Sequence, residues 1–115
     1  MAPDVLQVQT TVPSEADGER IAAHLVDHRL AACVQVVGPI RSTYRWQGRV
    51  EEAEEWLLLA KTTAALYPTV ASAIGALHPY DEPEVIALPV VAGSPGYLDW
   101  VAASVELPGR GAVGA

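Results

Sequence analysis

The sequence contains a single cysteine and few basic residues, and each shortage excludes a class of protein. Cys33 alone can form neither an intramolecular disulfide nor a zinc knuckle, so we expect a reducing, cytoplasmic compartment. Only 7 Lys and Arg residues stand against 14 Asp and Glu residues. A surface that binds nucleic acid needs a basic patch to neutralise phosphates. Nucleic acid is therefore not an expected partner.

Long hydrophobic runs are missing as well. The longest apolar stretches, residues 56–60 and 85–92, are far shorter than the roughly 20 residues of a membrane-spanning helix. No apolar segment typical of a signal peptide precedes Arg20. We therefore expect neither a membrane span nor export.

Apolar residues are nevertheless abundant, at 50% of the chain, and the formal net charge is −7. The apolar and acidic residues must therefore lie on different faces. A domain this small and this apolar is expected to bury surface between subunits.

The pattern of apolar residues predicts alternating strands and helices in one domain over residues 1–105. Residues 106–115, mostly Gly, Ala and Pro, are expected to form a flexible C-terminal tail. Helices are predicted after Ser14, from about Leu66 to Leu77 with Pro68 in the first turn, and over residues 95–105. Strands are predicted over residues 5–12, 30–37, 40–47, 50–62 and 84–91.

Glycine and proline residues show where these strands end and how they follow one another. Gly38-Pro39 separates two of them, and Gly48 closes a long hairpin with a solvated tip and a buried base. Pro89 indicates an edge strand or a bulge, because proline cannot donate a hydrogen bond to a neighbouring strand. The result is an α+β, ferredoxin-like βαββαβ sandwich with a long middle hairpin and an extra C-terminal helix.

Four stretches, in this order, resemble the CutA family of divalent-cation tolerance proteins. They are RLAACV at 29–34, STYRWQG at 42–48, HPYDEPE at 78–84 and YLDW at 97–100. The resemblance covers roughly residues 5–105. It implies a ferredoxin-like subunit in a tight homotrimer with strand pairing between subunits, similar in architecture to the PII signalling proteins. It also implies a link to tolerance of divalent metal cations, copper in particular.

Copper ligands in bacterial members of this family are a cysteine in the first strand and two adjacent histidines. The matching positions here are Thr10, Leu77 and His78. Only His78 keeps a metal-binding side chain, since thiolate and imidazole are the donors that make a copper site strong. We therefore expect weak binding of a divalent cation, copper or zinc, at His78. The alternative is that His78 is structural and forms hydrogen bonds across the turn.

Other groups invite a metal interpretation and also have plainer ones. Cys33 lies in an apolar strand and is expected to be a buried small hydrophobe. His24 and His28 have the helical spacing of a shared metal site, although two solvated surface histidines would show the same spacing. The hairpin carries four acidic residues that either attract cations loosely or form a solvated tip that discourages aggregation: Glu51, Glu52, Glu54 and Glu55.

A second function remains open, in which the trimer is a PII-like sensor or scaffold for a small molecule or a protein partner. Its cleft, formed by two adjacent subunits, would be lined by Tyr44, Trp46, Lys61, His78, Tyr80 and Glu84. Packing between subunits is the simpler interpretation of the aromatic residues. The sequence has no phosphate-binding loop or nucleophile motif, so we expect no enzyme; His78 with Glu84 as an acid–base pair is the remaining catalytic alternative.

Overall fold

Strands and helices alternate along residues 4–108, the part of the chain described by the structure, which is a computed structural model. The strands are β1 (Val5–Val12), β2 (Cys33–Trp46), β3 (Arg49–Thr63) and β4 (Ile86–Pro89). The helices are α1 (Glu15–Asp27), α2 (Tyr67–Leu77) and α3 (Pro95–Ser104), and a 3-10 turn (Ala64–Leu66) precedes α2. The predicted βαββαβ order with an added C-terminal helix is confirmed.

The four strands form one antiparallel sheet in the order β2-β3-β1-β4, which is the ferredoxin-like arrangement. β1 is central and pairs with β3 along its whole length. β4 is an edge strand that pairs only with β1. Pro89 therefore lies on an edge, as its missing N–H predicts.

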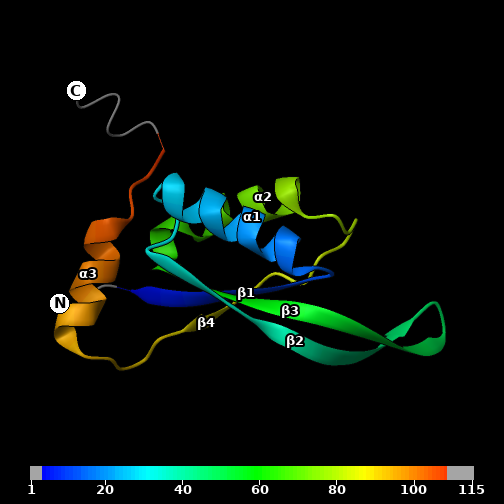
Figure 1. Ribbon diagram of the computed structural model, residues 1–115. Helices are drawn as coiled ribbons and strands as arrows, with labels where there is room; N and C mark the ends of the chain where they lie inside the picture. The colour runs from blue at the N-terminus through cyan, green and yellow to red at the C-terminus, as the bar shows by residue number, and fades with distance from the viewer. Residues whose placement is uncertain (1–3, 109–115) are drawn as a thin grey trace.

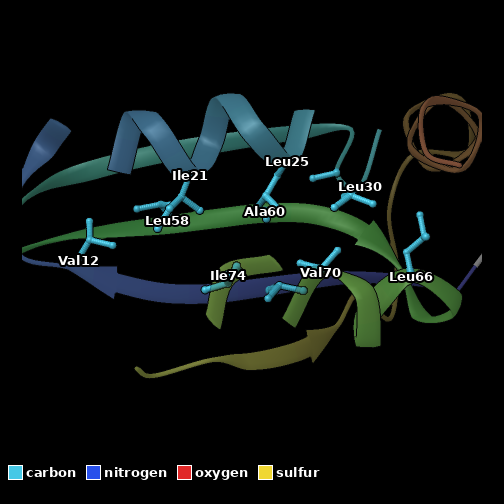
Figure 2. Packing of buried hydrophobic residues seen from close by; sticks show 11 residues of the cluster. Val12, Ile21, Leu25, Leu30, Leu58, Ala60, Leu66, Val70 and Ile74 are labelled. Atoms are coloured by element: carbon cyan, nitrogen blue, oxygen red, sulfur yellow. The ribbon is translucent and has the colours of Figure 1, made fainter. Parts of the chain in front are cut away.

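Helices α1 and α2 lie side by side over one face of the sheet (Figure 1). Because side chains alternate along a strand, every second residue of β1 and β3 points toward these helices. Figure 2 shows how the resulting core packs. Its buried members are Val8, Val12, Ile21, Leu25, Leu30, Ala31, Leu58, Ala60, Leu66, Val70 and Ile74. Each fully buried aliphatic side chain contributes about 1.5–3 kcal/mol to folding. Among the described residues, no helix is long and apolar enough to cross a membrane.

Both ends of α1 are fixed by local hydrogen bonds. Ser14 caps the start: its Oγ accepts a hydrogen bond from the Asp17 backbone N–H at 3.1 Å and donates one to the Asp17 carboxylate at 2.8 Å. The hydrogen bond from the Ser14 hydroxyl to the carboxylate, and then the one from Arg20, lowers the pKa of Asp17. At the other end Arg29 has a φ of 58°, and the Leu30 N–H donates back to the carbonyl oxygen of Leu25 at 2.8 Å. The second strand consequently begins at Cys33, and the prediction that it begins at residue 30 is wrong.

Gly38-Pro39 does not divide β2, contrary to the prediction of two strands. β2 continues from Cys33 to Trp46 and absorbs the dipeptide as a register shift against β3, between Val37 and Ile40. The peptide bond before Pro39 is cis. The indole of Trp56 occupies the space beside Gly38, where an added Cβ would overlap Cδ1 of Trp56. The last strand is also shorter than residues 84–91, because its ladder ends with β1 at Leu6↔Pro89.

Beyond the Val12↔Trp56 pair, β2 and β3 pair only with each other. Residues 40–55 therefore project from the sheet as a two-stranded hairpin arm (Figure 1). Gln47 and Gly48 both have positive φ, 49° and 77°, as the tight turns of hairpins require. Trp46 is 55% exposed and Val50 65% exposed. The predicted solvated tip is confirmed at these residues, and the predicted buried base is confirmed at Leu58 and Ala60.

Among residues 4–108, no helix covers the second face of the sheet except α3, which packs at one end (Figure 1). There Leu98 and Val101 of α3 bury Val5 and Ala32. We call the remainder of this face the open face. It carries Gln7, Gln9, Thr11, Cys33, Gln35, Val37, Leu57, Leu59, Lys61, Ile86 and Leu88.

The chain after α3 remains in contact with the domain over its first residues. The Glu106 N–H donates to the Arg29 carbonyl oxygen at 2.9 Å, and Leu107 packs against the main core. Residues 109–115 of the predicted tail lie outside the described residues.

Two glycine substitutions should separate tight packing from open space. Gly38→Ala should lower the free energy of unfolding by about 1–3 kcal/mol, because the new methyl group overlaps the Trp56 indole. Gly75→Ala in α2 meets no atom within 4 Å and should raise it by up to about 1 kcal/mol through helix propensity. Thermal unfolding of both variants at one protein concentration tests this. Equal effects would contradict the packing at Gly38.

Candidate functional site

A cavity of about 710 Å³ lies between the hairpin arm and the turn that follows α2. Four residues of the predicted ligand cleft line it within one chain: Tyr44, Trp46, Tyr80 and Glu84. The other lining residues are Thr11, Ser42, Thr43, Glu55, Pro79, Asp81 and Glu82. The arm begins beside Thr11, near the end of β1. The turn is held at the same place, because Nε2 of His78 lies 2.8 Å from the Thr11 carbonyl oxygen.

Glu55 is the buried acid of this cavity, with 7% of its surface exposed. Its Oε2 accepts a hydrogen bond from the Tyr80 hydroxyl at 2.8 Å. Burial, and then this bond to Glu55, raises the pKa of Tyr80. The expectation that Glu55 belongs to a solvated tip is therefore wrong. Side chains alternate along a strand, so Glu55 lies on the same face as Leu57 and Leu59. This alternation is the feature of the sequence that distinguishes Glu55 from a solvated acid.

The charged residues that line the cavity are all acidic. Its lining includes Glu55, Asp81, Glu82 and Glu84, and none of the eleven lining residues is Lys, Arg or His. A concave surface with carboxylates of one sign raises the local concentration of cations. The cavity therefore attracts positive charge, without a fixed cation of its own.

His78 lies next to this cavity and is buried by the turn that it stabilises. The Tyr80 backbone N–H donates to Nδ1 of His78 at 3.1 Å. Nδ1 must therefore offer its lone pair, so the proton lies on Nε2, which donates to the Thr11 carbonyl oxygen at 2.8 Å. Both ring nitrogens are thus engaged in hydrogen bonds across the turn. This geometry fits the structural role of His78 and leaves no free lone pair for a metal.

The other two positions of the copper pattern also lack suitable geometry. Thr10 faces the helices from β1 and is 1% exposed, and its hydroxyl has no hydrogen-bond partner among the described residues. Leu77 packs against the core, while its carbonyl oxygen accepts from Arg20 at 2.9 Å. Within residues 4–108 no three His, Cys, Asp or Glu side chains gather closely enough to hold a metal ion. The residues present at these positions therefore do not fit a copper ion.

Lys61 does not line the cavity of its own chain. It lies on the open face opposite Cys33, and its Nζ donates to the Gln35 side chain at 2.6 Å. Cys33 is half-buried there, not buried as expected, and its Sγ lies 3.4 Å from the Tyr97 hydroxyl. The hydrogen bond to Cys33, and then burial, raises the pKa of Tyr97 to about 12. The predicted cleft joins two adjacent subunits, so the contribution of Lys61 to it stays a prediction.

The proposed acid–base pair is likewise not assembled in one chain. Glu84 lines the cavity and is exposed, but the hydrogen bonds of the His78 ring go to Tyr80 and to Thr11. A general base needs a free lone pair within reach of the proton that it removes. His78 in this arrangement offers none.

Replacing each of the two buried threonines of the sheet by valine should change the free energy of unfolding in opposite directions. Thr10→Val should raise the free energy of unfolding by about 1 kcal/mol, because it removes a buried hydroxyl without a partner and keeps the shape. Thr62→Val should lower it by about 1 kcal/mol, because the Thr62 hydroxyl donates to the Leu30 carbonyl oxygen at 2.7 Å. Denaturant unfolding of both variants measures the contrast. Destabilisation by Thr10→Val would show that its hydroxyl has a partner.

Comparison with known proteins agrees with this architecture. Residues 6–104 match the model of a family described as "CutA1 divalent ion tolerance protein". The divalent-cation tolerance protein CutA of Thermus thermophilus is 51% identical over 94 residues, which are 82% of this chain and 91% of that protein. The mouse protein CutA is 45% identical over 91 residues, 79% of this chain, but the match covers only 51% of the longer mouse protein.

A solved structure gives the same result in three dimensions. The divalent cation tolerance protein Cut A1 from Thermus thermophilus superposes with a TM-score of 0.87 at 47% sequence identity. The superposition covers 89% of this chain and 99% of that one. The family match includes all three helices and nearly the whole sheet. The chain therefore belongs to the CutA1 divalent ion tolerance family.

Proposed function

We propose that this chain forms a cytoplasmic homotrimer without enzymatic activity that contributes to divalent-cation tolerance by binding copper or zinc weakly. The strongest support is the family match over residues 6–104. The chain's net charge of −7 and its acidic cavity favour cations over anions. The single cysteine is in keeping with a reducing compartment.

Weak binding follows from the donor groups. Strong copper sites combine several soft or imidazole ligands in a fixed geometry. Here both nitrogens of the buried His78 already form hydrogen bonds, and Thr10 and Leu77 provide neither thiolate nor imidazole. A cation bound to exposed side chains keeps most of its water and exchanges readily.

The trimer is supported by surfaces that one chain leaves unpaired. A two-stranded ribbon such as the hairpin arm is at best marginally stable alone in water. The open face presents Val37, Ile86 and Leu88 to solvent, each more than one third exposed. Identical chains that cover the open face and support the arm would remove both defects.

Metal titration tests the cation part of the proposal. Calorimetric titration of the wild-type protein with Cu²⁺ and Zn²⁺ should give dissociation constants on the order of micromolar or weaker, as expected for a site with few ligands. His78→Gln should leave these constants within about twofold, because the ring is not a ligand. Circular dichroism establishes that the variant is folded. A loss of at least tenfold in a folded His78→Gln protein would restore His78 as the ligand.

The assembly is tested by a matched pair of surface variants. Light scattering should give the wild type three times the 12.2 kDa mass of the chain. Leu88 on the open face and Val26 on α1 are both 43% exposed. Leu88→Glu should shift the mass toward the monomer, because it places a charge in the interface, whereas Val26→Glu should keep the trimer. A monomeric wild type, or a trimer in both variants, contradicts an interface on the open face.

A further inference from the structure

Two histidines meet on the surface of α1, on the side of the molecule opposite the open face. His24 is half-buried in the last turn of the helix, and His28 is the exposed residue that ends it. Their rings stack with centroids 4.1 Å apart and planes inclined by 24°. The i, i+4 spacing therefore brings two imidazoles into direct contact, which solvated side chains without a common partner need not do.

The hydrogen bond of His28 prepares its ring for metal binding. Nδ1 of His28 lies 3.0 Å from the carbonyl oxygen of His24. A carbonyl can only accept, so Nδ1 carries the proton and the neutral ring directs the lone pair of Nε2 away from the helix. Histidines that bind metals are commonly oriented in this way, with the second ring nitrogen donating to a backbone carbonyl. His28 thus differs from His78, in which both ring nitrogens already form hydrogen bonds.

The position on the helix also favours a cation. The C-terminal end of a helix carries about half a negative charge, and α1 ends at Asp27, next to His28. Asp27 adds a full carboxylate, and Arg29 opposes it with one positive charge. The net charge of −7 on the whole chain adds a general, long-range attraction for cations.

The distance between the rings is within the range that side-chain rotation can close. Two imidazole nitrogens bound to one ion at about 2.0–2.1 Å are about 3.0–3.4 Å apart. In the stacked arrangement, with centroids 4.1 Å apart, the two rings face each other, so both must turn about their side-chain torsions before their Nε2 lone pairs point at one ion. No further protein ligand joins them among residues 4–108, so water must fill the remaining positions.

We propose that His24 and His28 form a surface site for a divalent transition-metal ion, Cu²⁺ in preference to Zn²⁺. This inference rests on the proposed function and gives it a location. Imidazole donors select such ions over Mg²⁺ and Ca²⁺, and the usual affinity order puts Cu²⁺ above Zn²⁺. Two protein ligands make the site weak and exchangeable. Because α1 covers the face opposite the open face (Figure 1), a trimer assembled through the open face would leave the site accessible, once per chain.

Calorimetry and NMR spectroscopy of the intact protein test this site. Cu²⁺ should bind once per chain, and His24→Gln or His28→Gln should each weaken binding at least tenfold. Asp27→Asn is the matched control, because it removes a neighbouring charge without removing an imidazole, and it should change the affinity by less than about threefold. Substoichiometric Cu²⁺ should broaden first the amide signals of residues 20–31. Mg²⁺ at the same concentration should leave them unchanged.

The outcomes separate this inference from the function on which it rests. If Cu²⁺ binds the double variant His24→Gln/His28→Gln as it binds the wild type, the inference is wrong and weak cation binding still stands. Equal losses in Asp27→Asn and in the histidine variants would also overturn it, because attraction by charge alone would then explain binding. If neither Cu²⁺ nor Zn²⁺ binds the wild type at all, the proposed cation binding is wrong as well.

Discussion

The packing of α1 and α2 against a single face of the sheet is the constraint on which the rest of the structure depends. It buries alternate side chains of β1, and of β3 outside the hairpin arm, in a continuous apolar core. The alternate side chains, from Gln7 to Leu59, lie on the face where, within the described part of the chain, α3 alone packs, at one end. One face of the sheet is thus covered by the main core, whereas the cover of the other face by described residues is incomplete. The hairpin arm extends this incompleteness, since no third strand of the described residues pairs with its two strands.

Most of the fold could be predicted because local signals and tertiary structure agree. Ser14 caps α1, Pro68 lies in the first turn of α2 and Pro89 lies on an edge, as the chemistry of each residue requires. The errors arose where tertiary contacts decide. Gly38-Pro39 is a strong turn signal, but pairing with β3 continues on both sides of it and holds the strand together. Nothing local distinguishes Leu30 from a strand residue; its N–H is taken by the end of α1.

The candidate site was predictable in part for the same reason. Tyr44, Trp46, Tyr80 and Glu84 were chosen by residue type, and the fold brings them to one cavity. Glu55 was missed because it stands among three other acids, and only the strand register shows that it turns inward toward Tyr80. Lys61 lies several residues away along β3 of the same chain, and its place in a cleft formed by two subunits stays a prediction. Hydrogen-bond geometry, which decides the role of His78, is not encoded in any spacing of residues.

The position of β1 has a consequence for synthesis on the ribosome. The first strand of the chain is central, and its two neighbours, β3 and β4, come from residues 49–63 and 86–89. During translation β1 therefore emerges long before either neighbour exists. The β2–β3 hairpin can form early from adjacent segments, but the sheet closes only after Leu6 finds Pro89. Until then the apolar side chains of β1 have no complete partner surface, so a nascent chain of this protein depends on late, nonlocal closure to hide them.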